Sequence, residues 1–219
     1  MKVLVKEQIA ESGIDLLREQ FDVELGFDMD DVELAKRIGE FDAILIRSAT
    51  KLTSELIERA DRMKVIGRAG TGVDNVDIPA ATKRGIIVAN APESNSVAAA
   101  EHTLALALAL FRNVPQAHGS LVAGRWDRGL YKGSELYGKT LGVIGFGRIG
   151  QLVARRAQAF DMEVLAFDKF VSAERFRDLG VEGVSTVEEM YERADLLTIH
   201  LPKTPETVNW IDSDAIASM

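Results

Sequence analysis

Residues 139–150 read Lys-Thr-Leu-Gly-Val-Ile-Gly-Phe-Gly-Arg-Ile-Gly, an apolar run that breaks into spaced glycines. The apolar half predicts a buried strand, and apolar residues at helical spacing beyond the glycines predict a helix. At such a strand-to-helix turn, Gly145 allows the tight turn, Gly147 lets a pyrophosphate approach the backbone, and Gly150 allows close helix packing. The free N–H groups at the start of the helix then favour a phosphate group.

A carboxylate at a suitable distance strengthens this interpretation, because a glycine-rich turn alone is about as often a plain structural turn. Residues 163–167 predict a second apolar strand, and Asp168 follows it, 18 residues after Gly150. A carboxylate at this spacing binds the ribose hydroxyls of a dinucleotide and repels a 2′-phosphate, which favours NAD over NADP. The alternative is a solvated aspartate that starts a loop, and Lys169 beside it could soften the repulsion.

The composition sets the class of protein. The chain has 219 residues, 47% of them hydrophobic, and its 26 basic and 34 acidic side chains give a net charge of −8. This charge argues against nucleic acid or an anionic membrane as the main partner. The chain has no cysteine, which excludes disulfides and thiolate zinc sites, and we expect no metal site. The N-terminus predicts a strand and lacks the apolar region of a signal peptide, so we expect a cytoplasmic protein.

Strands and helices alternate along the chain, which predicts an α/β protein with doubly wound parallel sheets. In the first part we expect strands over residues 2–5, 23–25, 42–47, 64–67 and 86–89. The helices between them are expected over residues 9–19, 30–38, 53–60 and 78–84. In the first helix Ile14, Leu16 and Leu17 should face the core, and Asp28 is the expected cap of the second. These elements predict two doubly wound domains, one over 1–94 and a second, which contains the glycine turn, over 95–219.

Three loops of the first domain leave the carboxyl ends of their strands, the edge where open parallel sheets bind ligands. Arg47 and Ser48 begin the first loop, Gly70 and Gly72 lie in the second, and Asn95 lies in the third. Arg47 could supply a bidentate contact to an acidic ligand, and the N–H groups around the two glycines could form an anion nest. Singly, each has a plain alternative as a surface arginine, a turn or a helix cap. Together they favour a small anionic substrate.

The segment 96–111 is the most apolar of the chain and predicts a buried helix, with Ser96 as its cap, that is too short to span a bilayer. It is apolar nearly all round from Leu104 onward, so we expect cover on several sides, at a domain junction or a subunit interface. His102 in this helix is interpreted as structural. The strand expected over 195–200 places His200 at the ligand edge of the second sheet, where a contact with loop backbone is favoured over an acid/base role.

Five segments, taken together, resemble the D-isomer-specific 2-hydroxyacid dehydrogenases. They are residues 47–51, 67–77, 90–96, 145–150 and 200–207. The likeness runs over essentially the whole chain. It implies that 1–94 is a flavodoxin-like substrate domain and that 95–219 is a Rossmann NAD-binding domain, incomplete at its C-terminus. It also implies a homo-oligomer that oxidises 3-phosphoglycerate to 3-phosphohydroxypyruvate with NAD, the first step of serine biosynthesis.

The resemblance also implies roles for particular residues. Those that would line NAD are Thr71, Gly145, Gly147, Arg148, Ile149, Gly150, Asp168, His200, Leu201, Pro202 and Thr207. Those that would bind the substrate are Arg47, Ser48, Gly70, Gly72, Asn95 and Arg128, the last reaching a neighbouring subunit's site from the 96–131 region. The family's catalytic arginine, glutamate and histidine would follow Met219. No catalytic residue is therefore expected within these residues, and the chain alone is expected to be inactive.

Two other functions stay open at this point. Another dehydrogenase of the same family, such as a glyoxylate or hydroxypyruvate reductase, would share the cofactor turn, although Arg47 with Lys51 favours a phosphorylated substrate. An NAD-sensing corepressor, resembling the C-terminal binding proteins, would bind peptides without turnover. The loops that favour an anionic substrate would have no purpose in a corepressor.

Overall fold

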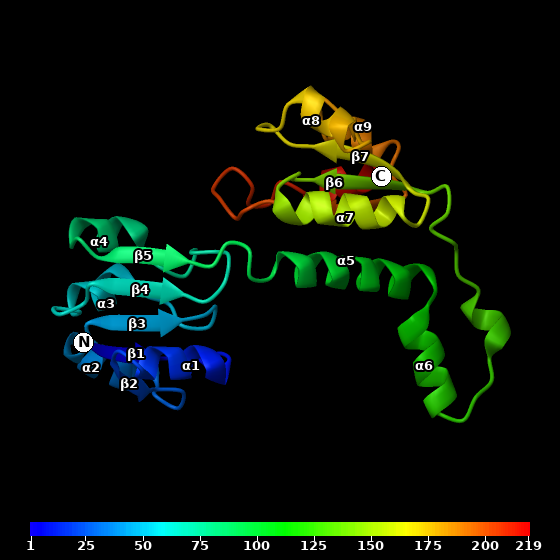
Figure 1. The fold of residues 1–219 in the computed structure, drawn as a ribbon. Coiled ribbons are helices and arrows are strands. Elements are labelled where there is room, and N and C mark those ends of the chain that lie inside the picture. Colours follow the sequence, from blue (N-terminus) through cyan, green and yellow to red (C-terminus); the bar gives the residue numbers. More distant parts are fainter. The chain divides into compact units, whose positions relative to one another are not determined.

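The computed structural model describes residues 1–219, which divide into two compact units, Met1–Asn95 and Ser96–Met219. Each unit contains one sheet of parallel strands with helices between them (Figure 1). The prediction of a doubly wound α/β fold is confirmed.

The sheet of the first unit has the strand order β2-β1-β3-β4-β5, which is the flavodoxin-like order. Its strands are β1 (Lys2–Val5), β2 (Asp22–Leu25), β3 (Ala43–Ile46), β4 (Val65–Arg68) and β5 (Ile87–Asn90). The helices are α1 (Glu11–Arg18), α2 (Asp31–Arg37), α3 (Ser54–Glu58) and α4 (Ile78–Lys83), with a short 3₁₀ turn η1 (Ile38–Glu40). Because all strands run in parallel, their carboxyl ends lie at one edge of the sheet.

One face of this sheet carries the larger core. Helices α2, α3 and α4 bury Leu34, Ile57 and Ala81 in one cluster with strand residues such as Leu4 and Ile66. Ile14 of α1 is buried as well but lies outside that cluster. This division agrees with right-handed crossovers, which place α1 on the opposite face from α2, α3 and α4.

Two local predictions for this part of the chain were wrong. Leu16 is exposed, because α1 begins at Glu11 and directs only Ile14 fully into the core. Asp28 does not cap α2, since the side chain of Asp30 accepts the hydrogen bond from the N–H of Glu33 at 2.7 Å.

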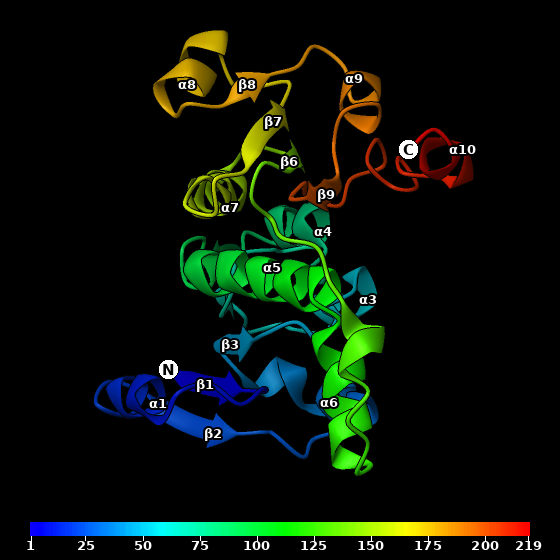
Figure 2. The ribbon, with the colours of Figure 1, turned by 90° about the vertical axis from the view of Figure 1, so that its right-hand side faces the viewer.

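The second unit begins with two helices, α5 (Ser96–Phe111) and α6 (Val114–Val122), and a 3₁₀ turn η2 (Arg128–Tyr131). Its sheet has the order β8-β7-β6-β9, formed by β6 (Thr140–Ile144), β7 (Glu163–Phe167), β8 (Glu182–Gly183) and β9 (Leu196–Ile199). This is the order 3-2-1-4 of a Rossmann sheet. The remaining helices, also visible in Figure 2, are α7 (Arg148–Gln158), α8 (Ala173–Asp178), α9 (Glu188–Tyr191) and α10 (Ser213–Ala217).

Helices cover both faces of the second sheet. On one face α5 packs along α7, where Ala100 and Leu104 share a core with Val153 and Ala157. On the other face α9 contributes Met190 to a smaller core. The expected cover of α5 on several sides is not seen within the chain, and Ser96, the expected cap, makes no hydrogen bond through its hydroxyl group.

No single helix is both long and apolar enough to cross a membrane. Helices α5 and α6 meet the length and composition required only as a pair, and they are bent by 65° at the break between them.

Candidate functional site

The glycine turn of the second unit has the geometry that a dinucleotide requires. Gly145 follows β6 with a φ of +91°, and a Cβ there would lie 2.7 Å from the carbonyl oxygen of His200. A Cβ on Gly150 would run into the carbonyl oxygen of Gly145, so helix and strand pack as closely as the sequence predicted. A Cβ on Gly147, in contrast, would meet nothing within 4 Å. The middle glycine therefore leaves room for a ligand against the backbone.

Helix α7 presents its amino end at this turn. Its N-cap is Gly147, and no side chain caps the helix. The first-turn N–H groups, which include that of Ile149, are thus not covered by a capping side chain, and the helix dipole favours an anion there. The residues present fit the diphosphate of a dinucleotide.

Asp168 lies beside the same turn, directly after β7. One of its carboxylate oxygens accepts a hydrogen bond from the N–H of Phe146, and the other accepts one from the N–H of Phe170, both at 2.8 Å. A carboxylate oxygen has two lone pairs, so each oxygen keeps one acceptor position. The half-buried carboxylate can therefore receive hydroxyl groups of a ribose while the backbone holds it at the glycine turn.

The loop after β9 forms the other wall of this region. The N–H of His200 donates to the carbonyl of Ile144 at 2.7 Å, and the imidazole Nε2 lies 2.9 Å from the hydroxyl of Thr198. Burial lowers the pKa of His200, which favours the neutral imidazole. The Thr207 hydroxyl donates to the carbonyl of Pro202 at 2.7 Å and closes the loop on itself.

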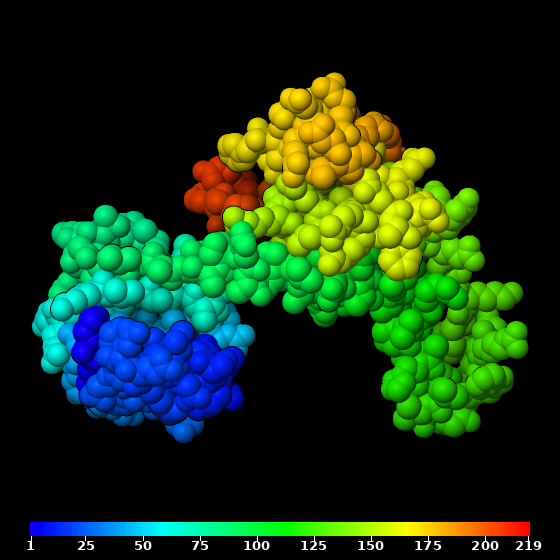
Figure 3. Space-filling view, in the orientation of Figure 1, coloured from blue at the N-terminus to red at the C-terminus, as the bar shows by residue number.

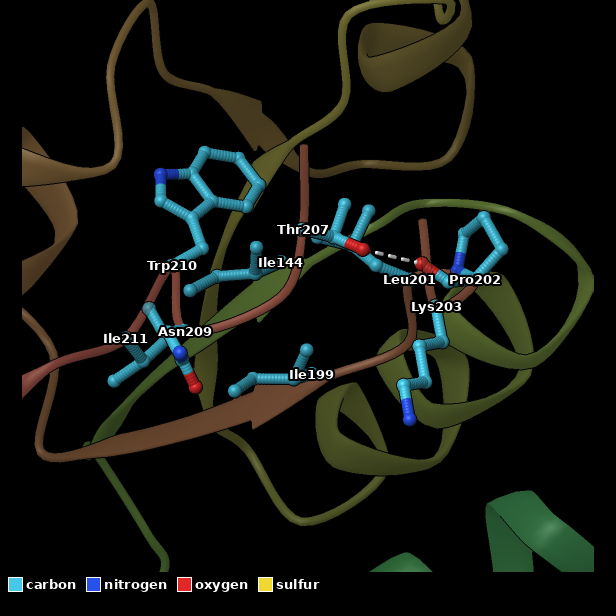
Figure 4. A pocket seen from close by; sticks show the side chains of 9 residues that line it. All are labelled: Ile144, Ile199, Leu201, Pro202, Lys203, Thr207, Asn209, Trp210 and Ile211. Carbon is cyan, nitrogen blue, oxygen red and sulfur yellow. Dashed lines mark hydrogen bonds between the residues drawn. The ribbon is translucent and has the colours of Figure 1, made fainter. Parts of the chain in front are cut away.

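A hollow of about 340 Å³ opens next to this loop (Figure 4). Its lining comes from the ends of β6 and β9 and from the segment that follows β9. The lining residues are Ile144, Ile199, Leu201, Pro202, Lys203, Thr207, Asn209, Trp210 and Ile211. The structure thus brings together the predicted residues of the second sheet at one edge, with Leu201, Pro202 and Thr207 on the wall of this hollow.

The first unit gathers its predicted residues at the carboxyl edge of its own sheet. The Thr71 hydroxyl donates to the side-chain oxygen of Asn95 at 2.6 Å, and the side-chain amide of Asn90 donates to the carbonyl of Thr71 at 2.6 Å. A Cβ on Gly70 would run into the guanidinium group of Arg68. The loops after β4 and β5 are therefore tied together around the two predicted glycines.

The loop that carries Arg47 is held from two sides. The carboxylate of Glu7 accepts hydrogen bonds from the N–H groups of Arg47, Ala49 and Thr50 at 2.8, 3.1 and 2.9 Å. The side-chain amide of Asn75 donates to the carbonyls of Arg47 and Thr50 at 2.7 and 2.6 Å. The loop keeps its backbone fixed while the Arg47 side chain stays exposed.

Glu7 is held as a carboxylate by this arrangement. Burial alone would raise its pKa, but the hydrogen bonds from the backbone N–H groups outweigh burial and lower the pKa of Glu7 below its usual value. The loop is therefore anchored on a charge that persists at neutral pH.

Three charged residues at the same edge were missed by the sequence analysis. Lys6 and Glu7 follow β1, and Arg68 ends β4 with a buried Nε atom that has no hydrogen bond. The available signal was the same as for Arg47, a charged residue directly after an apolar strand. Because β1 and β3 are parallel, the loop after β1 lies at the same edge of the sheet as the loop that carries Arg47.

Arg128 and Thr71 each lie in a different unit from the other residues predicted for the same ligand. Arg128 begins η2 and is exposed, in the second unit, whereas the other predicted substrate residues lie in the first unit. Thr71, predicted to line the cofactor, lies in the first unit with Asn95, whereas the glycine turn lies in the second. Both roles stay predictions.

Comparison with known proteins assigns the chain to a family. Residues 104–219 match the family described as "D-isomer specific 2-hydroxyacid dehydrogenase, NAD binding domain", which confirms the predicted cofactor, NAD. The chain is 48% identical over 219 residues to the D-3-phosphoglycerate dehydrogenase of Methanocaldococcus jannaschii, covering 100% of the chain and 42% of that protein. It is 46% identical to D-3-phosphoglycerate dehydrogenase 2, chloroplastic, of Arabidopsis thaliana, covering 100% of the chain and 35% of that protein.

Solved structures agree with this assignment. The TT0316 protein of Thermus thermophilus superimposes with a TM-score of 0.91 at 35% identity, over 100% of the chain and 70% of that protein. D-lactate dehydrogenase from Aquifex aeolicus, in complex with NAD and lactic acid, superimposes with a TM-score of 0.87 at 27% identity, over 100% of the chain and 66% of that protein. The chain thus spans about two fifths of the curated relatives named above and about two thirds of these structures. It belongs to the D-isomer specific 2-hydroxyacid dehydrogenases.

Proposed function

We propose that the protein oxidises 3-phosphoglycerate to 3-phosphohydroxypyruvate with NAD. The observation that carries the proposal is the position of Asp168, whose carboxylate is held at the glycine turn by the N–H of Phe146. The choice of substrate is supported by the arginine-bearing loop of the first unit and by the relatives named D-3-phosphoglycerate dehydrogenase.

In this proposal residues 95–219 bind the cofactor. The diphosphate is received by the backbone of the turn and the start of α7, through Gly145, Gly147, Arg148, Ile149 and Gly150. Asp168 accepts the ribose hydroxyls and disfavours the 2′-phosphate of NADP by charge repulsion. The loop after β9 lines the remainder of the NAD molecule, through His200, Leu201, Pro202 and Thr207. Thr71 of the first unit is the other residue proposed to line NAD. When bound, NAD supplies the acceptor for the hydride of the substrate.

Residues 1–94 bind the substrate, together with Asn95. Arg47 and Ser48 receive the phosphate, and the backbone around Gly70 and Gly72 receives the carboxylate, through N–H groups other than that of Gly70, which donates to the carbonyl of Arg68. This role of Arg47 is supported by the clamp on its loop, because a backbone fixed in advance leaves only the side chain to be ordered when an anion binds.

The segment 96–131 is proposed to form a subunit interface. Leu106 and Leu110 of α5 are 58% and 66% exposed, which is unusual for the most apolar helix of the chain. Helix α6 and the segment after it, coloured green in Figure 3, protrude from the rest of the second unit. A second copy of the chain would cover this apolar surface, and Arg128 would then reach a neighbouring substrate site.

A turnover assay of the full-length protein tests the proposal. The protein should form NADH from NAD and 3-phosphoglycerate, with little activity when NADP replaces NAD. Turnover of glyoxylate or hydroxypyruvate without turnover of 3-phosphoglycerate would instead indicate a different reductase of the family. Binding of NAD with no turnover of any 2-hydroxy acid would indicate a binding protein.

A further inference from the structure

A second hollow lies at the carboxyl edge of the first sheet. Its volume is about 400 Å³, and it is separate from the hollow of the second unit. The lining residues come from the ends of β1 and β3, from the segment before α2 and from the first residue of α2. They are Lys6, Glu7, Gln8, Phe27, Asp31, Arg47, Ala49 and Thr50.

Lys6 is the unusual member of this lining. The residue is only 9% exposed, and its ammonium group makes no hydrogen bond or ion pair in the structure. At the other end of the same strand, the ammonium group of Lys2 lies 3.0 Å from Glu24 and 3.4 Å from Glu40. The stem of Lys6 is therefore largely buried, while its ammonium group has no counter-charge within the protein. The hollow therefore contains one cation that has no counter-charge from the protein.

The two carboxylates of the hollow do not supply that counter-charge. Glu7 is engaged by the three N–H groups of the Arg47 loop. Asp31 lies in the first turn of α2 and is exposed, where the helix dipole favours a negative charge. Neither carboxylate forms an ion pair with Lys6. Both carboxylates keep their charge but are held away from Lys6, so the cationic groups that can contact an anionic ligand are those of Lys6 and Arg47.

We propose that Lys6 and Arg47 together bind the phosphate of the substrate and that Lys6 sets the preference for a phosphorylated over an unphosphorylated 2-hydroxy acid. This inference rests on the proposed function and adds a specificity residue to it. A phosphate monoester carries nearly two negative charges at neutral pH, and one arginine neutralises only one of them. Lys6, fixed by burial next to the clamped Arg47 loop, supplies the second positive charge without having to be ordered when the substrate binds.

Steady-state kinetics of the full-length protein with two variants at Lys6 tests the proposal. Lys6→Met keeps most of the apolar stem and removes the charge. It should raise the KM for 3-phosphoglycerate by about 10- to 100-fold, as expected for the loss of a charge-assisted hydrogen bond, and leave kcat and the KM for NAD nearly unchanged. The preference for 3-phosphoglycerate over D-glycerate should fall by a similar factor. Lys6→Arg should restore much of the preference, and Lys83→Met, at an exposed lysine of α4, should behave as the unmutated protein.

The outcomes separate this inference from the proposed function. If the unmutated protein oxidises 3-phosphoglycerate and Lys6→Met does so with the same KM, the inference is overturned while the proposed function stands. If the unmutated protein does not oxidise 3-phosphoglycerate, both fail.

A second measurement uses the unmutated protein and does not depend on how the variants fold. Bound 3-phosphoglycerate should slow the acetylation of Lys6 by acetic anhydride, followed by mass spectrometry, and leave that of Lys83 unchanged. Inorganic phosphate should protect Lys6 as well and should compete with 3-phosphoglycerate in the kinetic assay. Equal acetylation of Lys6 with and without 3-phosphoglycerate would overturn the inference.

Discussion

Replacing Asp168 tests the placement of the cofactor. Asp168→Ala removes the carboxylate that we expect to accept the ribose hydroxyls, and it removes the acceptors for the N–H groups of Phe146 and Phe170. The variant should bind NAD more weakly, because two hydrogen bonds to a charged group are lost. It should also tolerate NADP better, because the charge that repels a 2′-phosphate is gone.

The magnitude follows from the contacts. Hydrogen bonds to a charged group contribute about 1.5 to 3 kcal/mol each, and the half-buried position of Asp168 favours the lower end of that range. The expected loss of about 2 to 4 kcal/mol corresponds to a rise of roughly 30- to 1000-fold in the Kd for NAD. The two lost backbone contacts should lower the free energy of unfolding by about 1 to 3 kcal/mol.

Calorimetric titration of the full-length protein with NAD and with NADP measures both effects. Asp168→Asn is the matched control, since it removes the charge but keeps an oxygen acceptor for one of the two N–H groups. It should relax the discrimination against NADP as Asp168→Ala does, with a smaller loss of stability. Unchanged affinities in the alanine variant would refute the placement of the ribose at this carboxylate.

Further predictions concern the glycine turn, the loop clamp and the proposed interface. Gly150→Ala should lower the free energy of unfolding by about 2 kcal/mol, because the added Cβ runs into a backbone carbonyl. Gly147→Ala should keep the melting temperature of the unmutated protein and bind NAD at least about tenfold more weakly, because its Cβ occupies the space left for the ligand. Equal behaviour of the two variants in thermal melts and NAD titrations would contradict this. Because the pKa of Glu7 is lowered in the folded state, its stabilisation is complete above the usual pKa of 4.5 and is lost as the pH falls through the lower folded value. Urea unfolding between about pH 6 and pH 3.5 should therefore show a smaller pH dependence for Glu7→Gln than for the unmutated protein, and identical slopes would speak against the anchor. Leu106→Glu combined with Leu110→Glu should reduce the oligomer size measured by light scattering without unfolding the subunit, and an unchanged mass would rule out this face as the interface.

The sequence predicted the order of elements and the cofactor turn because both depend on short-range patterns. A strand, three glycines, a helix and a second strand place Asp168 beside Gly145 through the parallel pairing of β6 with β7. The number of residues between the glycines and Asp168 was therefore enough to predict that this carboxylate lies at the glycine turn.

Contacts between distant segments could not be read in this way. Glu7 accepts its hydrogen bonds from residues about 40 positions away, and nothing local to Val5-Lys6-Glu7 indicates that partner. The cap of α2 depends on where the helix starts, which the pattern gives only to within a few residues. Leu16 was predicted to face the core because the sequence shows only that the helix has a stripe of apolar residues. Which residues of that stripe contact the sheet depends on how the helix packs on it.

The most direct test is a crystal structure of the full-length protein with NAD bound. The diphosphate should lie against the backbone N–H groups between Gly145 and Gly150 at the amino end of α7, with both ribose hydroxyls of the adenosine at the carboxylate of Asp168. A diphosphate bound elsewhere, or an adenosine ribose without contact to Asp168, would contradict the account.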